Sequence, residues 1–393
     1  MKKSLNKSLS VFLSVLLLFI LCSCSKDDET SSESGQSATE TTASQTDSVE
    51  PTTLSAEETA NRKIDKIISE MTVEEKVGQM FYVRCPDSDA VNMVSEYHLG
   101  GYILFGRDFE DKTKDEITEN IKSYQNASKV PMLIGVDEEG GTVVRVSSNT
   151  NLRSTPFLSP SDTFFSGGWQ AIDSDAEEKA DLLLSLGINV NMAPDCDITS
   201  DPNAFMYYRS FSGYADKASD YVQRVVKISK DKKLGTVLKH FPGYGNATDT
   251  HTGIAYDDRD YSEFTENDFK PFTAGINAGA DCVLVAHIIV NSMDSEYPAS
   301  LSDKVHSILR NDLNFDGVIM TDDLAMDAIT DYTGNEAAAV IAAKCGNDIL
   351  CCSDVETQYP AVLKAVKDGE ISENQIDASV KRILKWKSNL GLI

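Results

Sequence analysis

Short apolar segments alternate with longer amphipathic segments along most of the chain. The apolar segments are often opened by Gly or Asp, which is typical of strands buried on both faces of a parallel sheet. Helical periodicity lies between them, for example at 114–127, 215–232 and 303–313, and a long final helix should follow the N-cap Ser372. The predicted strands are residues 77–83, 100–106, 131–137, 188–194, 236–242, 281–287, 317–323 and 347–353.

Eight strands alternating with helices predict a single (β/α)8 barrel, a TIM-like α/β fold. A doubly wound open sheet is the alternative, but no GxGxxG follows the first strand and no P-loop sequence occurs in the chain. Polar residues follow four of the predicted strands, and in a barrel these strand ends form the rim that carries the active site of enzymes. They are Asp137-Glu138-Glu139, Lys239-His240, His287 and Asp322-Asp323. The pattern therefore predicts an enzyme.

The first residues of the chain have the features of an export signal. Three lysines occur among the first seven residues, and residues 11–21 are apolar apart from Ser14. Such a segment is too short to span a bilayer comfortably and is typical of a secretory signal. LCSC at 21–24 resembles a bacterial lipobox, so we expect a lipoprotein signal peptide at residues 1–24, lipidation of Cys24 and an extracytoplasmic, membrane-anchored protein. An ordinary cleaved signal is the alternative.

Residues 25–55 consist mostly of Ser, Thr, Asp, Glu and Gln, with little that is apolar. Such a segment buries too little surface to offset its ordering entropy, so we expect a disordered linker. Residues 56–393 remain, enough for one large domain, and we expect a monomer. The net charge of −26 argues against nucleic acid and against an electrostatic grip on anionic lipid. Membrane contact is expected through the lipid anchor only.

Six cysteines follow the predicted signal peptide, and most lie within apolar runs, which predicts small buried core residues. Their spacing does not match a zinc site, and the sequence cannot pair them into disulfides. They are Cys85, Cys196, Cys282, Cys345, Cys351 and Cys352.

The segment KHFPGYGNATDTHTG, residues 239–253, holds two of the five histidines in a loop rich in Gly, Asn and Thr. It resembles the KHFPGHG…DSH motif of glycoside hydrolase family 3, in its N-acetyl-β-glucosaminidase branch. Further segments match that family in the same order, and together they cover residues 64–393. They are MTVEEKVGQMF, VDEEGGTVVR, GINVNMAPDCDI, RSFSG, LVAHI, PASLS and VIMTDDLAM. The resemblance implies an N-terminal-type (β/α)8 catalytic domain of a β-N-acetylhexosaminidase.

The resemblance also implies roles for individual residues. Asp322 corresponds to the catalytic nucleophile, His251 to the general acid/base, and Asp249 to the partner that orients the histidine. A retaining glycosidase needs such a carboxylate and such a proton donor, and histidine titrates near neutrality. Asp323 is expected to favour the start of the next helix.

Further positions correspond to residues that contact the terminal sugar. Asp137, Arg209, Lys239 and His240 would hold its hydroxyl groups. His287 and Met326 would lie at the pocket wall. No cofactor is implied, and because Asp249, His251 and His240 have no recognised ligand spacing, no metal site is expected.

Two departures from the family pattern concern this loop. Tyr244 replaces the usual second histidine of FPGHG, and the chain between Gly245 and Asp249 is one residue shorter than the commoner spacing. The D-x-H unit is retained, so we expect the catalytic chemistry of the family. The two departures concern the fit of the leaving group beyond the terminal sugar.

The first functional hypothesis is a retaining, exo-acting β-N-acetylglucosaminidase that acts on peptidoglycan fragments or chito-oligosaccharides. A phosphorylase is the alternative, because a neutral histidine does not repel an incoming phosphate. A non-catalytic sugar-binding lipoprotein on the same barrel is a hypothesis from another class. A β-glucosidase of the same family also remains, although those enzymes generally take their acid from a second domain.

Overall fold

The computed structural model describes residues 55–245, 253–333 and 335–393, which form one compact unit. The predicted signal peptide at 1–24 with Cys24 lies outside the described residues, as does the linker up to residue 54. Asp249 and His251 also lie outside them. Within the described part of the chain, no helix is long and apolar enough to cross a membrane.

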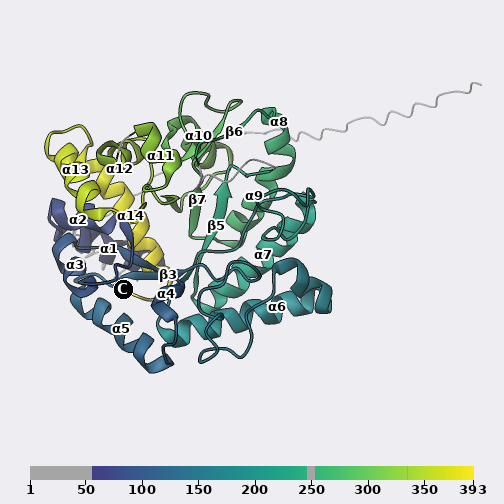
Figure 1. Ribbon diagram of the computed structural model, residues 1–393. Coiled ribbons are helices and arrows are strands. Elements are labelled where there is room, and N and C mark those ends of the chain that lie inside the picture. The colour runs from purple at the N-terminus through teal and green to yellow at the C-terminus, as the bar shows by residue number, and fades with distance from the viewer. Residues whose placement is uncertain (1–54, 246–252, 334) are drawn as a thin grey trace, which may run out of the picture. The chain divides into compact units, whose positions relative to one another are not determined.

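Eight parallel strands form one sheet in the order β10-β1-β2-β3-β4-β5-β7-β9. An isolated parallel bridge between Met320 in β9 and Ile349, just before β10, brings the two edges together. The sheet is therefore a nearly closed barrel with helices around it (Figure 1), as predicted, and not an open sheet. Its strands are β1 Phe81–Arg84, β2 Gly101–Leu104, β3 Leu133–Val136, β4 Val190–Asn191, β5 Gly235–Phe241, β7 Cys282–Val285, β9 Val318–Thr321 and β10 Leu350–Cys352.

The helices between the strands bury one face against the barrel. Predicted segments 114–127 and 215–232 are the helices α5 and α7, and Ser372 caps α14 by accepting a hydrogen bond from the Gln375 amide. The α-helices are α1 Ala56–Ser69, α2 Val73–Gln79, α3 Ala90–Tyr97, α4 Gly106–Phe109, α5 Lys114–Ala127, α6 Pro160–Leu186, α7 Ala215–Lys232, α8 Tyr261–Glu263, α9 Phe269–Ala278, α10 Asp303–Ser307, α11 Asp327–Thr333, α12 Asn335–Lys344, α13 Val355–Lys367 and α14 Glu373–Asn389.

Two predicted boundaries were wrong. Residues 77–79 close helix α2, because Thr72 and Glu75 form a capping box that starts the helix at Val73, and the first strand begins only at Phe81. The predicted helix at 303–313 changes after Ser307 into a π-helical segment, Ile308–Asp312.

A second, two-stranded sheet was not predicted. Strand β6, Ala255–Asp257, pairs in parallel with β8, Ile288–Val290. These strands are only three residues long, too short for hydrophobic periodicity to show them. Their position ties the chain just after Gly253 to the chain just after His287.

Five of the six described cysteines are buried, as predicted, and Cys345 is partly buried. All six are free thiols. Burial raises the pKa of Cys85 to about 12 and that of Cys345 to about 12, so these thiols stay protonated at neutral pH.

Lys387 in α14 is fully buried, and its Nζ donates a 2.7 Å hydrogen bond to Oε1 of Gln79 in α2. Burial lowers the pKa of Lys387 to about 7, whereas in the unfolded chain it is near 10.4. The folded state thus binds fewer protons between these two values, and this group's contribution to stability rises with pH across that window.

We expect Lys387→Met to remove this dependence. The difference in unfolding free energy between variant and wild type should move in favour of wild type from pH 7 to pH 10, because Lys387 must lose a proton on folding and that loss costs less as pH rises. Urea unfolding at several pH values measures it. A constant difference across this range would mean that Lys387 titrates alike in both states.

Candidate active site

A cavity of about 700 Å³ opens at the carboxyl ends of the barrel strands. Six of the residues predicted from the sequence line it, and they come from segments following β3 and β9, from β5, and from the chain before α7. They are Asp137, Arg209, Lys239, His240, Asp322 and Met326. The barrel therefore brings together residues that are up to almost two hundred positions apart in the chain, which is what the strand-end pattern predicted.

Four charged side chains form an ion-pair network in this cavity. Nζ of Lys239 lies 2.7 Å from Oδ1 of Asp137 and 2.6 Å from Oε1 of Glu139. The Arg209 guanidinium donates to both oxygens of Glu139, with Nε at 3.0 Å and Nη2 at 2.8 Å. Two carboxylates thus balance two cations, and each cation holds Glu139 in one orientation.

The network fixes the charges of its members. Burial by itself raises the pKa of Glu139, but the nearby Lys239 and Arg209 outweigh burial and hold that pKa well below its usual range. Burial likewise lowers the pKa of Lys239, yet Asp137 and Glu139 together raise it. Glu139 is therefore a carboxylate and Lys239 an ammonium throughout the physiological pH range.

The neighbouring Glu138 explains why the chain turns sharply here. Its side chain is fully buried and accepts hydrogen bonds from the backbone amides of Arg145, Val146 and Ser147, at 2.9, 2.7 and 3.2 Å. Asn191 in β4 accepts from the Glu138 amide at 3.0 Å. Glu138 thus folds the loop back on itself, while Asp137 and Glu139 on either side of it line the cavity.

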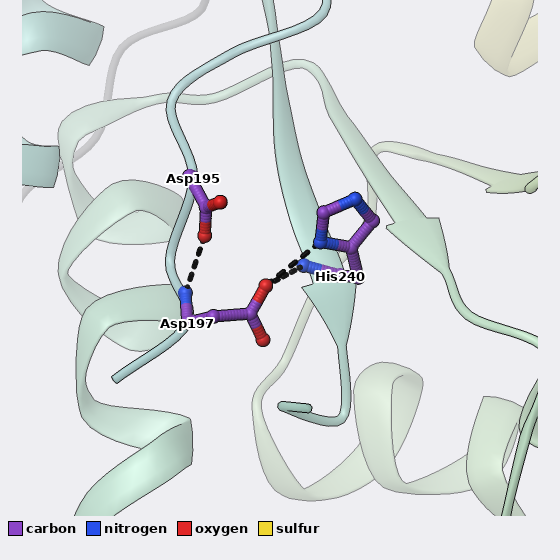
Figure 2. A group of neighbouring side chains, drawn as sticks. All are labelled: Asp195, Asp197 and His240. Carbon is purple, nitrogen blue, oxygen red and sulfur yellow. Dashed lines mark hydrogen bonds and ion pairs between the residues drawn. The ribbon is translucent and has the colours of Figure 1, made fainter. Parts of the chain in front are cut away.

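His240 is held in place by the carboxylate of Asp197, whose backbone amide donates in turn to Asp195 (Figure 2). Its Nδ1 lies 2.7 Å from Oδ2 of Asp197, and Oδ1 of Asp195 accepts from the Asp197 amide at 2.8 Å. The other ring nitrogen, Nε2, lies 3.2 Å from Nη2 of Arg209. A guanidinium can only donate, so Nε2 accepts, and the proton of the neutral imidazole is on Nδ1.

The pair Asp195 and Asp197 shares its charge unevenly. Burial and the charge of Asp197 raise the pKa of Asp195, whereas the hydrogen bond from His240 overcomes burial and lowers the pKa of Asp197. Asp195 therefore carries the proton, and Asp197 is the carboxylate that orients the imidazole.

Asp195, Asp197 and His240 offer three ligand atoms within 4.8 Å of one another, which is the spacing of a metal site. Both oxygens of Asp197 already accept hydrogen bonds, and Nε of Arg209 lies 3.8 Å from Oδ2 of Asp195. A metal ion here would face the guanidinium charge at short range. The arrangement fits a support for His240 better than a metal centre.

Tyr244 occupies the position where the family pattern has a second histidine. The side chain is buried, its ring meets the His240 ring edge-on at 5.3 Å, and its amide donates to Oδ1 of Asp197 at 2.6 Å. This substitution therefore packs behind His240.

Asp322 directly follows β9 and lines the cavity wall. Its Oδ1 accepts from the Asp323 amide at 2.8 Å. The side chain of Asp323 instead accepts from the amides of Ala325 and Ser353, each at 3.0 Å, and from the Ser353 hydroxyl. The two adjacent aspartates thus differ, because Asp323 braces the loop.

His287, which was predicted at the pocket wall, lies behind it. The side chain is fully buried, its Nδ1 lies 2.7 Å from Oγ of Ser300, and its Nε2 lies 3.0 Å from the backbone oxygen of Asp323. Because a carbonyl only accepts, Nε2 donates to it. The imidazole supports the Asp322-Asp323 segment and does not line the cavity.

Further residues that the sequence reasoning did not assign also line the cavity. They are Glu139, Arg145, Arg84, Phe105, Phe205 and Tyr208, among others. Arg145 is notable because its buried Nε has no hydrogen-bond partner among residues 55–245, 253–333 and 335–393. Glu139 and Arg145 both lie within the quoted VDEEGGTVVR segment, so their charge in that segment was the signal that could have found them.

The comparisons with known proteins agree with this geometry. The model of the glycosyl hydrolase family 3 N-terminal domain matches residues 72–386, so the chain belongs to glycosyl hydrolase family 3. The resemblance on which the sequence analysis relied is thereby confirmed.

Several individual relatives carry hexosaminidase names. Beta-hexosaminidase A of Pseudoalteromonas piscicida is 30% identical over 76% of this chain and 54% of its own length. Beta-hexosaminidase LpqI of Mycobacterium tuberculosis is 29% identical over 81% of this chain and 83% of its own length. A solved family 3 beta-N-acetylglucosaminidase from Paenibacillus has 30% identity and a TM-score of 0.77, covering 82% of this chain and 63% of that protein. The chain thus spans about half of the Pseudoalteromonas enzyme and most of LpqI.

Proposed function

We propose that this protein is a retaining, exo-acting β-N-acetylglucosaminidase that removes terminal β-linked N-acetylglucosamine. The observation that carries the proposal is the balanced network of Asp137, Glu139, Lys239 and Arg209, which is buried in the cavity that Asp322 lines. A network of fixed donors and acceptors of this kind suits the hydroxyl groups of one sugar ring. The names of the relatives, β-hexosaminidase and β-N-acetylglucosaminidase, support the choice of sugar.

In the proposed reaction Asp322 attacks the anomeric carbon while the glycosidic oxygen leaves with a proton from His251. This forms a covalent glycosyl-enzyme and frees the first product. Water then gives a proton to His251 and attacks the same carbon, which releases the sugar and regenerates the Asp322 carboxylate. Asp249 orients His251 and stabilises its charged form. Both of these loop residues lie outside the described residues, so their roles rest on the family motif.

Each member of the network has a proposed part in binding. Lys239 donates and Asp137 accepts at neighbouring sugar hydroxyls, and Arg209 donates from the other side of Glu139. His240 carries its proton on Nδ1, so its Nε2 accepts from Arg209 and helps to hold the guanidinium in the cavity. Met326 provides an apolar part of the cavity wall.

We further propose that peptidoglycan fragments or chito-oligosaccharides are the substrates and that the protein acts outside the membrane, anchored through Cys24. The lipobox-like LCSC at 21–24 supports this location. Labelling of cells with a fatty-acid analogue tests it, because wild type should incorporate the label and Cys24→Ala should not. Equal labelling of both proteins would contradict the anchor.

The proposed activity is tested by steady-state hydrolysis of an aryl N-acetyl-β-glucosaminide. We expect turnover of this sugar, and at least about tenfold less of the matching aryl glucoside, because one lost hydrogen-bonding group is worth that much in discrimination. The released sugar should be N-acetylglucosamine with or without phosphate present. A product that becomes N-acetylglucosamine 1-phosphate would instead support the phosphorylase alternative. Absence of turnover on every aryl glycoside would leave the sugar-binding hypothesis.

A further inference from the structure

Three aromatic side chains lie close together in the sequence beside Arg209. Phe205, Tyr207 and Tyr208 are 37%, 37% and 67% exposed, while Met206 between them is fully buried. Exposed rings that form a group can mark a contact site, and Phe205 and Tyr208 both line the cavity. The cavity therefore has an aromatic part that the ion-pair network does not use.

The backbone holds these rings in fixed positions. The Ala204 amide donates to the Asp201 carbonyl at 3.0 Å, and the amides of Arg209 and Ser210 donate to the Met206 carbonyl at 3.0 and 2.8 Å. Successive turns anchored by buried Met206 thus direct the Arg209 side chain to Glu139 while its neighbour Tyr208 stays exposed. Tyr208 and Arg209 therefore belong to one segment whose backbone is held by hydrogen bonds.

The exposed fractions of the lining side chains show which part of the cavity is closed and which part opens to solvent. Glu139 and Lys239 are each 3% exposed, whereas Tyr208 is 67% exposed. In the proposed exo-acting reaction the terminal sugar occupies the closed, charged part of the cavity, and the next residue of the substrate points toward solvent. That residue is the leaving group, and the aromatic segment is where it emerges.

Packing behind the segment is aromatic as well. The Phe205 ring lies 6.0 Å from the ring of Tyr244, which meets His240, and the Arg209 guanidinium lies 5.7 Å from the Phe205 centroid. Tyr207 meets Tyr208 edge-on, with centroids 5.2 Å apart and planes at 88°. An edge-on neighbour restrains the Tyr208 ring without stacking on it.

We propose that Tyr208, which Tyr207 meets edge-on, is a specificity-determining platform on which the second sugar ring of a β-linked N-acetylglucosamine oligosaccharide stacks. Pyranose rings present faces of C–H groups, and a fixed aromatic ring buries such a face with little loss of conformational entropy. The platform acts on the leaving group, so it rests on the proposed function. It distinguishes oligosaccharides from substrates with a small leaving group.

The test compares two substrates that share the terminal sugar. One is N,N′-diacetylchitobiose, and the other is N-acetyl-β-glucosaminyl fluoride, whose leaving group is a single atom and cannot extend to Tyr208. We expect Tyr208→Ala to lower the ratio of kcat/KM for chitobiose to kcat/KM for the fluoride about tenfold. Tyr208→Phe keeps the ring and should keep the ratio within about twofold. Tyr214→Ala is the matched control, since Tyr214 is 73% exposed and is not among the residues lining this cavity.

Each outcome decides the proposal. A ratio unchanged in Tyr208→Ala and in a second variant, Tyr208→Gln, overturns the platform, and so does an equal fall in Tyr214→Ala. Wild type that hydrolyses the fluoride but not chitobiose also contradicts it, while leaving the proposed sugar specificity intact. Wild type inactive on both substrates contradicts the proposed function itself. Thermal unfolding of each variant should give the wild-type midpoint, which shows that the change in the kcat/KM ratio comes from the lost ring and not from a damaged fold.

Discussion

Replacement of Asp322 by asparagine is expected to lower kcat for an aryl N-acetyl-β-glucosaminide by about 10⁴-fold or more. The amide has nearly the same shape as the carboxylate but lacks the charge, and its oxygen is too weak a nucleophile to form the glycosyl-enzyme. Binding of the terminal sugar should change much less, because the ion-pair network remains. The measurement is kcat and KM for wild type and variant, together with the dissociation constant of N-acetylglucosamine.

Asp323 provides the matched control for this prediction. It is the next residue, also an aspartate, and its carboxylate braces the loop by accepting from the amides of Ala325 and Ser353. We expect Asp323→Asn to lower the unfolding midpoint and to reduce kcat far less than Asp322→Asn does. If the two variants exchange these phenotypes, the nucleophile has been assigned to the wrong neighbour.

A slow substrate gives independent support for the nucleophile. A 5-fluoro N-acetylglucosaminyl fluoride should accumulate as a covalent adduct, because the fluorine destabilises the oxocarbenium-like transition state of its hydrolysis. Peptide mass mapping should find the added sugar on Asp322 in wild type. An adduct on another residue would contradict the proposed mechanism even if Asp322→Asn is inactive.

The second large effect concerns stability. Lys239→Met is expected to lower the free energy of unfolding by about 3–5 kcal/mol, because it leaves buried Glu139 and partly buried Asp137 with the Arg209 guanidinium as the remaining cation in the network. The unpaired carboxylate should take up a proton more readily in the folded state than in the unfolded state. The difference in unfolding free energy between Lys239→Met and wild type should therefore become smaller as pH falls through the pKa of that carboxylate. Urea unfolding at pH 5 and pH 7.5 measures both effects.

A double variant separates lost charge balance from lost packing. Lys239→Met with Asp137→Asn leaves Glu139 paired with Arg209 and removes the carboxylate that Lys239 balanced, so we expect it to be more stable than Lys239→Met alone. Lys232→Met is the matched surface control, because Lys232 pairs with Asp181 at the same 2.7 Å distance but both side chains are well exposed. Its cost should be much smaller than that of Lys239→Met, because an exposed ion pair contributes little to stability. A loss at Lys232 as large as that at Lys239 would show that burial does not govern the effect.

The barrel could be predicted from the sequence because its strands are buried on both faces and read as uninterrupted apolar runs. The predictions failed where two local signals compete for the same residues. At 77–79 an apolar run belongs to a helix, because the capping box of Thr72 and Glu75 starts that helix and hydrophobicity cannot distinguish the two states. Strands β6 and β8 are too short to leave a pattern.

The site was predictable where charge follows a strand, as at Asp137, Lys239 and Asp322. Glu139 was quoted but not assigned, because adjacent Glu138 and Glu139 look alike in a sequence and only the fold separates the buried brace from the ion-pair partner. His287 shows the converse, since a histidine at a strand end can support the rim from behind. Asp195 and Asp197 directly follow the predicted strand 188–194, but they were not assigned, because their link to His240 depends on two strands meeting.

The pairing of β6 with β8 has a consequence for anyone who wishes to exchange parts between family members. Strand β6 begins at Ala255, shortly after residues 246–252, and Ala255 is paired with Ile288, one residue after the histidine that supports the Asp322 segment. A segment taken from a relative together with its β6 strand would therefore bring a strand that pairs with the relative's own β8. A chimera should take both short strands from the same parent if the loop and the nucleophile segment are to keep a common register.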